Sequence, residues 1–179
     1  MSPHRRTLDT AAPVAAALPA VPVTVNTAIF EAGGIYDASD DYGSFVGRGG
    51  LSRSAMAAGY PRYGLPAAVT DAGWYAGAGR ESDDECRERA RGVLADLRAE
   101  ASALEANKNV MMVVHYDFIS ALLDAVLAPE TRGAFARWRH HNTAITVIDV
   151  TAKDGEVIFV AQNAVSHVTD PALLSGFPL

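Results

Sequence analysis

VVHYDFISALL, residues 113–123, joins an apolar run to an amphipathic one through a single histidine. The run that enters it, VMMVV (110–114), is apolar on both faces, as is typical of a central parallel strand. The run that leaves it has helical spacing and predicts a helix over about 118–127. His115 therefore stands where a buried strand meets a helix. That place suits an anion-binding imidazole or a core residue with its ring nitrogens hydrogen-bonded.

The N-terminal segment predicts a helix followed by a strand. Ser2-Pro3 supplies a capping hydroxyl and a proline for the first turn, and Pro13 inside the pattern predicts a kink. VPVTV (21–25) is expected to form a short strand. Residues 32–80 then hold most of the glycines and show little periodicity, apart from a short helix that Ser52 is expected to cap. A loop of this length is usually functional or mobile.

Three further signals follow in the second half of the chain. A capping box at 82–85 begins a long helix, which is expected to end at 107–109. Residues 129–138 are predicted to form another helix. AITVIDV and EVIFVAQ predict two strands of a hairpin, whose turn contains Asp154-Gly155.

The order of these elements predicts a single domain, residues 1–179, of the three-layer α/β/α class. We expect its sheet to be mostly parallel, with a C-terminal hairpin. In open sheets of this kind, ligands bind outside the carboxyl ends of the strands. His115 lies at such an end, and so does the loop that follows Val25. These two regions are therefore expected to face the same crevice.

Charge and composition exclude several classes of protein. The net charge is −6 and the pI is near 5.3, which argues against general nucleic-acid binding. No apolar stretch approaches the ~20 residues of a membrane helix. Asp9 and Pro13 interrupt the N-terminal apolar segment, so we expect a folded helix there rather than a signal peptide, and a cytoplasmic protein without membrane contact. The one cysteine, Cys86, allows no internal disulfide and is expected in the core.

The residue patterns of metal enzymes and serine hydrolases are missing from the sequence. The five histidines lack ligand spacing and no His-Glu-x-x-His occurs, so neither a metal site nor a cofactor is expected. No Gly-x-Ser-x-Gly is present to build a nucleophile turn. An anionic ligand would have to be held by local arginines, because the global field is negative.

Several segments together resemble the histidine phosphatase superfamily, whose fold is phosphoglycerate mutase-like. SPHRRTLDTA is similar to the family's Ser-Pro-x-x-Arg-x-x-x-Thr-Ala helix start, and IFEAGG to the segment that carries the acidic proton donor. VMMVVHYDFISALL is similar to the strand, second histidine and helix of the active site, and HHNTAITVIDV with NAVSHV to the closing strands and final loop. GRGGLSR, YPRY and VTDAGWY resemble a subgroup with an enlarged insertion after the acidic residue, here about 32–80.

The resemblance implies roles for individual residues. Arg6 matches the phosphate-binding arginine, Glu31 the acid that protonates the leaving oxygen, and His115 the second histidine. Backbone N–H groups from Tyr116 onward would assist His115 in binding phosphate. The implied ligand is a small phosphorylated molecule, and the implied reaction passes through a phosphohistidine. Without the resemblance, Arg6 would be taken for a solvated surface arginine. Partial burial after an apolar pair suits Glu31 to act as an acid, and the alternative is a loop carboxylate in solvent.

Other residues have more than one interpretation. Arg48 and Arg53 flank Gly49-Gly50 in the insertion and are expected either to grip the far side of a substrate or to be solvated. His167 resembles a family position near the rim of the pocket, and a structural role suits it equally. The remaining histidines are expected at the surface, namely His4, His140 and His141. Both tryptophans are expected to pack in the core or in a lid.

The chain departs from the family at the nucleophile. The family begins with a strand that ends in Arg-His-Gly, and no Arg-His-Gly occurs in the 179 residues. Arg139-His140 is followed by His141 and precedes a strand, so it does not stand in for the motif. By the resemblance, the first strand, the nucleophilic histidine and the first active-site arginine are absent. The chain as given is therefore expected to be inactive. Tyr116 also stands where family members often have glycine.

Two hypotheses stay open at this point. In the first, the protein is a phosphatase or a phosphoglycerate mutase-like enzyme whose sequence here lacks its start. In the second, it is a non-catalytic relative that retains Arg6, Glu31 and His115 and binds phosphate or another protein. Loss of a central strand would leave unpaired backbone groups and exposed apolar side chains. A homodimer would cover them most simply.

Overall fold

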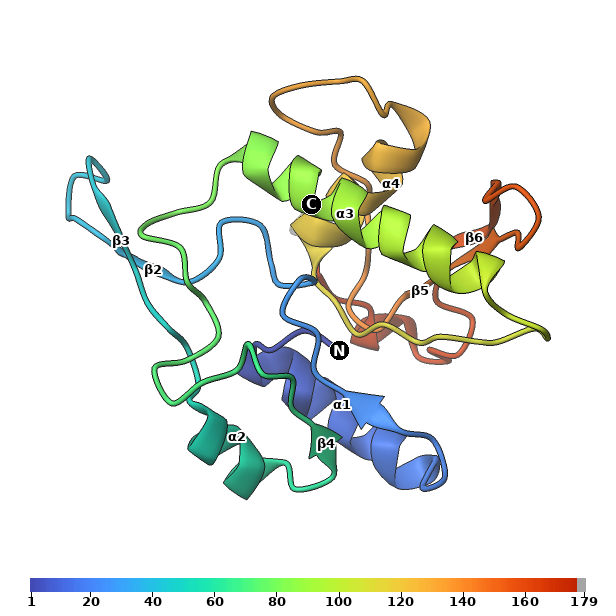
Figure 1. Cartoon of the computed structure of the whole chain (residues 1–179), viewed down its shortest axis with the longest axis horizontal. Helices are drawn as coiled ribbons and strands as arrows, with labels where there is room; N and C mark the ends of the chain where they lie inside the picture. The colour runs from blue at the N-terminus through green and yellow to red at the C-terminus, as the bar shows by residue number, and fades with distance from the viewer. Residues whose placement is uncertain (177–179) are drawn as a thin grey trace.

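The computed structural model describes residues 1–176 and shows a mixed α/β chain with long connecting loops (Figure 1). In chain order the elements are α1 (Arg5–Ala17), β1 (Val23–Thr24), β2 (Tyr36–Ala38), β3 (Phe45–Gly47), α2 (Arg53–Gly59), β4 (Tyr63–Gly64), α3 (Asp83–Ser102), α4 (Tyr116–Leu127), β5 (Ile145–Val150), β6 (Val157–Ala164) and a 3-10 helix (Pro171–Leu173). Among residues 1–176, none of the helices is both long and apolar enough to cross a membrane.

α1 begins close to the predicted start, but with a different cap. His4 rather than Ser2 is the N-cap residue, and its side chain makes no capping hydrogen bond. Thr7 Oγ1 donates instead to the carbonyl oxygens of Ser2 and His4, at 3.0 and 2.7 Å. Pro13 lies inside the helix, as predicted. The first turn is thereby tied to the Ser2-Pro3 segment, and this turn carries Arg6.

The capping box that begins α3 is confirmed. Ser82 Oγ accepts from Glu85 N at 3.3 Å, and Glu85 Oε2 accepts from Ser82 N at 2.8 Å. α3 ends at Ser102, before the predicted 107–109, because residues 103–110 are all exposed and a longer helix would gain no packing. α4 begins directly after His115 and packs against α3.

The strands form three two-stranded sheets rather than the predicted mostly parallel sheet. β1 pairs with β4 in parallel, whereas β2–β3 and β5–β6 are antiparallel. The predicted strand at 110–114 is extended chain that forms no ladder within the described residues. A ladder needs a neighbouring strand, and Val110 and Met111 are 54% and 63% exposed.

The first two residues lie between two parallel segments, as a short strand would. Met1 N donates to Thr24 O at 2.8 Å, and Asn26 N donates to Met1 O at 2.8 Å. On the other side, Ser2 N donates to Val113 O at 3.0 Å. Such alternation is the hydrogen-bond pattern of parallel pairing. It brings the start of α1 next to the end of the 110–114 segment.

The predicted helix at 129–138 is wrong, because these residues form an irregular loop. Gly133 has a φ of 76°, in the left-handed region. Arg87 Nη2 donates to the carbonyl oxygens of Gly133 and Ala134, at 3.2 and 2.8 Å, which a helix would offer to its own N–H groups. The buried Arg87 side chain also pairs with Asp124 of α4. A tertiary contact therefore overrides the local helix signal.

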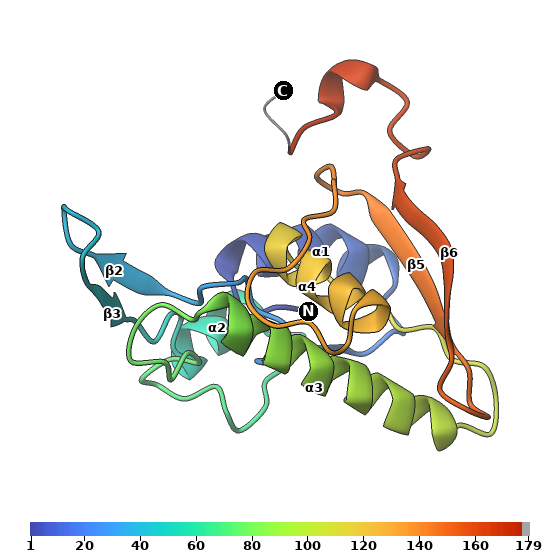
Figure 2. The same ribbon diagram turned by 90° about the horizontal axis from the view of Figure 1, so that it is seen from above.

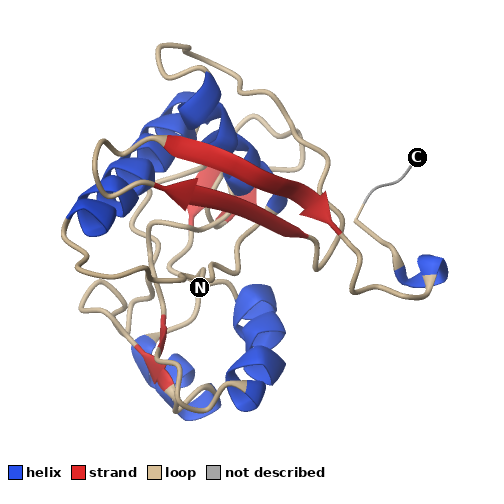
Figure 3. Cartoon of the chain, turned by 90° about the vertical axis from the view of Figure 1, so that its right-hand side faces the viewer, coloured by secondary structure: helices blue, strands red, loops and turns tan. Residues whose placement is uncertain are grey.

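The C-terminal hairpin is confirmed. β5 and β6 pair with Val150 opposite Val157, and Gly155 in the turn has a φ of 69°. Figures 1 and 2 place this hairpin and the β2–β3 ribbon at opposite ends of the long axis. Figure 3 shows the hairpin spread across one face of the molecule, with helices behind it.

Two core clusters meet at two loop segments. Ile29 and Val114 pack with α3 and α4, whereas the residues beside them, Phe30 and Val113, pack with α1 and α2. In each segment the next residue is a predicted site residue. It lies at the carboxyl end, where α/β folds place their ligand sites.

The insertion at 32–80 is held together by close backbone contacts. Trp74 N donates to Gly49 O at 2.7 Å. Ser52 caps α2 as predicted, because its Oγ accepts from Ala55 N at 3.1 Å. Trp74 packs in the same core cluster as Leu8 of α1, so the insertion folds back onto that helix.

Candidate functional site

Arg6 and His115, which are distant in sequence, are in direct contact. Arg6 Nε donates to His115 Nδ1 at 3.0 Å, and Ser2 Oγ lies 2.7 Å from His115 Nε2. Arg6 belongs to the first turn of α1, and His115 is the N-cap residue of α4. The contact therefore joins the N-terminal ends of two helices, whose dipoles favour an anion there.

The partners of His115 determine its protonation state. A guanidinium can only donate, so Nδ1 is the acceptor and the neutral ring carries its proton on Nε2, directed at the Ser2 hydroxyl. Burial lowers the pKa of His115 to about 2, and the charge of Arg6 acts in the same direction. The ring is 7% exposed. His115 is thus neutral at physiological pH.

Glu31 is held at the N-terminus of α4. Its Oε1 accepts from Phe118 N at 3.0 Å and from Ala32 N at 2.9 Å. Burial raises the pKa of Glu31 above its ordinary value, against the lowering effect of these two hydrogen bonds. Asp117 raises the pKa further and Arg6 lowers it. Burial therefore favours the protonated form of Glu31 more than water would, and Arg6 opposes that effect.

His4 is part of this group, contrary to the expectation that it lies at the surface. Its ring packs edge-on against those of Trp74 and His115, with centroids 4.9 and 4.7 Å apart. Its Nε2 is buried and has no hydrogen-bond partner within the described residues. Burial lowers the pKa of His4 to about 4, with a further lowering by Arg6. No motif distinguished this histidine in the sequence.

His140 is also not at the surface as predicted. It is 9% exposed, and burial lowers its pKa. The ring of Tyr116 lies edge-on to it at 6.1 Å between centroids. His141 is half-buried, with its Nδ1 enclosed. His140 therefore packs beside the start of α4 instead of facing solvent.

A cavity of about 470 Å³ opens beside Arg6, between α1 and the insertion. Its lining combines two arginines and a carboxylate with apolar side chains: Pro3, His4, Arg5, Arg6, Asp9, Ile35, Gly50, Leu51 and Trp74. His115 and Glu31 do not line this cavity. Arg6 and His4 both line the cavity and both contact His115.

The other predicted site residues are engaged elsewhere. Arg48 forms an exposed ion pair with Asp37. Arg53 donates to three backbone carbonyls of the insertion, those of Leu65, Pro66 and Val69. His167 is exposed in the turn after β6. Both arginines therefore brace the insertion itself, and their contact with a substrate stays a prediction, as does that of His167.

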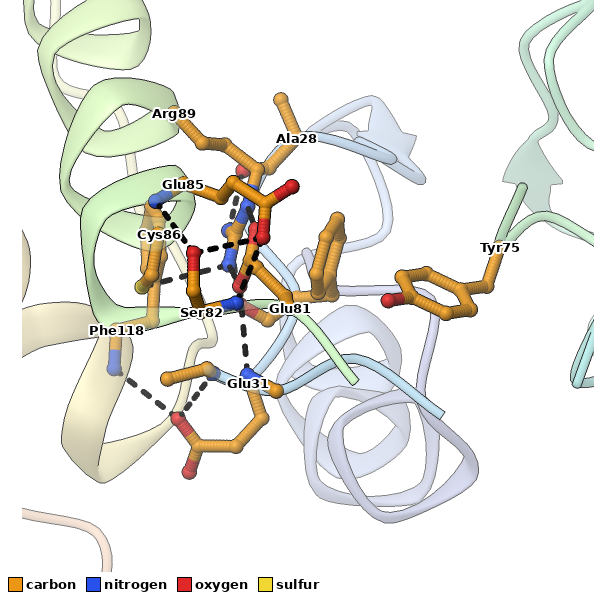
Figure 4. A network of polar contacts seen from close by, with 12 residues as sticks. Ala28, Glu31, Tyr75, Glu81, Ser82, Glu85, Cys86, Arg89 and Phe118 are labelled. Carbon is orange, nitrogen blue, oxygen red and sulfur yellow. Dashed lines mark hydrogen bonds and ion pairs between the residues drawn. The ribbon is translucent and has the colours of Figure 1, made fainter. Parts of the chain in front are cut away.

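An ion pair that the sequence did not reveal supports the Glu31 loop (Figure 4). Arg89 of α3 pairs with Glu81 at 2.6 Å, and both side chains are nearly buried. Arg89 also donates to the carbonyl oxygens of Ala28 and Phe30, on the segment that leads to Glu31. Neither charge belongs to a pattern that local sequence reasoning uses.

The described residues show no group of three or more histidine, cysteine or acidic side chains that could hold a metal ion. Cys86 is fully buried in the core, as predicted, and burial raises the pKa of its thiol to about 12. Cys86 therefore stays a neutral thiol at neutral pH and does not serve as a nucleophile. The polar groups that the structure gathers beside the start of α4 are Arg6, His115 and Glu31, with His4 against the His115 ring.

Comparison with protein-family models gave a match to this chain. No curated protein and no solved structure gave a significant match. The family model described as histidine phosphatase superfamily (branch 1) matches residues 1–163, which include α1, the Glu31 loop and His115. The chain belongs to branch 1 of the histidine phosphatase superfamily.

Proposed function

We propose that the protein binds the phosphate group of a small phosphate monoester between Arg6, His115 and Glu31, within the phosphohistidine chemistry of its family. The observation that carries the proposal is the contact of Arg6 Nε with His115 Nδ1 at the N-terminal ends of two helices. Because no Arg-His-Gly occurs in the 179 residues, we also propose that the chain as given lacks the nucleophile and does not turn over.

Each group has one task in this proposal. The guanidinium of Arg6 offers a fork of donors to two phosphate oxygens, and His115 donates to a third. When a histidine nitrogen attacks phosphorus, the ester P–O bond breaks and the leaving oxygen needs a proton. Glu31, whose pKa is raised by burial, supplies that proton.

Phosphate binding requires the contact between Arg6 and His115 to open. Arg6 Nε donates to His115 Nδ1 in the structure. When phosphate binds, a phosphate oxygen must take the place of His115 Nδ1 as the acceptor of this Arg6 hydrogen bond. The freed Nδ1 can donate to phosphate only if it gains a proton. A neighbouring dianion favours that protonation, against the burial that now lowers the pKa of His115.

An NMR titration with inorganic phosphate tests the proposal. We expect amide shifts at Ser2, Arg6 and His115, and an affinity roughly 10-fold or more weaker in Arg6→Gln, because a charged hydrogen bond is lost. Arg98→Gln is the matched control, since Arg98 donates to Gly155 O at the hairpin turn. It should bind phosphate as the unaltered protein does. Equal affinity in the Arg6 variant would contradict the proposal.

Turnover is tested separately. The chain should hydrolyse p-nitrophenyl phosphate no faster than a His115→Ala control. Clear activity that His115→Ala abolishes would mean that another residue serves as the nucleophile.

A second candidate function is that of a non-catalytic phosphate-binding or protein-interaction module that forms a homodimer. Exposed apolar side chains favour it. They lie on the 110–111 segment and on the C-terminal hairpin: Val110, Met111, Ile145, Val147, Ile158, Phe159 and Val160. Exposed apolar groups on neighbouring strands are typical of surfaces that associate.

A further inference from the structure

We infer that Arg89 and Glu81 form a positioning pair that holds the Glu31 carboxyl group against the N-terminus of α4. This inference rests on the role given to Glu31 in the proposed function. Neither residue touches the Arg6–His115 contact, and the pair acts on the loop at 28–33 (Figure 4).

Arg89 holds the side of the loop that precedes Glu31. Its Nη1 donates to Ala28 O at 2.9 Å and to Phe30 O at 3.0 Å. Its guanidinium carbon lies 3.5 Å from the centroid of the Phe30 ring and 4.8 Å from that of Phe118. The same cation therefore contacts the loop and the α4 residue whose N–H binds Glu31.

Glu81 orients Arg89 and holds the other side of the loop. Its two oxygens accept from Arg89 Nε at 2.7 Å and from Arg89 Nη2 at 2.6 Å, a bidentate pair. Glu81 Oε2 also accepts from Gly33 N at 3.3 Å, and Glu81 N donates to Gly33 O at 3.1 Å. Glu31 thus lies between two points fixed by one buried ion pair.

The pair acts on Glu31 through geometry. The charged groups that shift the pKa of Glu31 are Asp117 from α4 and Arg6 from α1. The main effect is burial, which raises that pKa and which depends on the loop staying in place. Release of the loop should expose the carboxyl group and remove the hydrogen bond from Phe118 N.

α3 also contains a matched control. Arg87, which lies two positions before Arg89 in the sequence, is buried, pairs with Asp124, and donates to the carbonyls of Gly133 and Ala134. Its contacts are of the same kind, one carboxylate and two backbone carbonyls, but they hold the 128–140 loop. Arg87→Lys and Arg89→Lys therefore remove equivalent interactions from two different loops, because lysine keeps the charge and loses the fork.

The experiment measures the pKa of Glu31 from its side-chain ¹³C chemical shift, in the full chain without ligand. We expect the pKa to fall toward the ordinary 4.5 in Arg89→Lys and to stay at the wild-type value in Arg87→Lys. Hydrogen exchange at Phe118 N–H should become faster in the Arg89 variant only. Glu81→Gln, which keeps the shape and loses the charge, should give a smaller shift in the same direction.

An unchanged Glu31 pKa in a folded Arg89→Lys protein would overturn the inference. An equal fall in Arg87→Lys would overturn it too, because general loosening would then explain the result. If Arg89→Lys does not fold, Glu81→Gln decides by the same criteria. Since no phosphate is present, these outcomes are independent of the phosphate titration, so a failure of the proposed function is seen separately.

Discussion

His115 is kept neutral by its surroundings. The ring lies between a donor that cannot accept, Arg6, and the Ser2 hydroxyl, in a place almost closed to water. Protonation at Nδ1 would set two cationic donors against each other without solvent to separate them. The same residue that suits an anion is therefore uncharged until an anion arrives, which makes the Arg6–His115 contact the resting state of the proposed site.

The stability of the fold should depend on pH through His115. Its pKa is about 2 in the folded chain and 6.5 in an unfolded one. Below pH 6.5 the unfolded chain takes up a proton that the folded chain does not, so stability falls as the pH falls. His115→Gln should reduce the loss between about pH 7 and about pH 5 by about 2 kcal/mol. His4, with a pKa of about 4, supplies part of the remaining slope.

Urea unfolding of the two proteins at each pH measures this difference. His167→Gln is the control, because His167 is exposed in the turn after β6. The same pH slope in His115→Gln and in the wild type would show that His115 titrates normally in the folded chain.

At the residue scale, sequence reasoning proposed the groups of the site but did not predict their contacts. Arg6, Glu31 and His115 follow from motifs, because their chemistry depends on residue type and local order. His4 and Arg89 did not, because what distinguishes them is the packing of distant segments around a ring and a guanidinium. Only a tertiary structure brings Trp74 to His4, or residues 28–33 to Arg89.

At the element scale, the folded conformation of the insertion depends on glycines at places where two backbone segments approach too closely for a Cβ atom. Gly73 has a φ of 109°, and a Cβ atom there would lie 2.0 Å from Gly49 O. Gly92, inside α3, has open space where its Cβ would be. Substitution by alanine should therefore act in opposite directions at these two positions.

We expect Gly73→Ala to lower the free energy of unfolding by about 1–3 kcal/mol, since it adds strain in the left-handed region and a backbone clash. Gly92→Ala should raise it by about 0.5–1 kcal/mol, through helix propensity. Urea denaturation of both variants checks the signs. Destabilisation by Gly92→Ala equal to that by Gly73→Ala would mean that the α3 surface at that position is packed.

The elements that were predicted correctly have local causes. Ser52 and the Ser82–Glu85 capping box fix the starts of two helices through hydrogen bonds within a single turn, and Asp154-Gly155 supplies the turn of the hairpin. Two of the wrong predictions have non-local causes. In the 129–138 loop, Arg87 donates to two backbone carbonyls that a helix would use for its own hydrogen bonds. Residues 110–114 have too few neighbouring strands to form a ladder.

At the scale of the whole molecule, the two ends of the long axis carry different surfaces. Each ends in a two-stranded ribbon (Figures 1 and 2). The β5–β6 hairpin exposes several large apolar side chains, including Val160 at 58%. The β2–β3 ribbon at the other end carries two, Tyr42 in its turn at 75% and Val46 at 55%, beside the charged pair Arg48–Asp37. Association of two copies is therefore expected at the hairpin.

The different surfaces of the two ribbons allow a matched pair of valine-to-lysine substitutions to test where the dimer contact lies. In the dimer hypothesis, Val160→Lys places a charge in the buried contact and should shift the protein to monomer at concentrations where the wild type is dimeric, as measured by light scattering after size exclusion. Val46→Lys changes an equally exposed valine of the other ribbon and should leave the dimer intact. A lysine on a hydrophobic interface costs desolvation without a partner, whereas on a free surface it costs little. The hairpin would be excluded as the dimer contact if the wild type were monomeric at every concentration. It would also be excluded if Val46→Lys dissociated the dimer and Val160→Lys did not. Neither result would affect the phosphate site, which the phosphate titration tests separately.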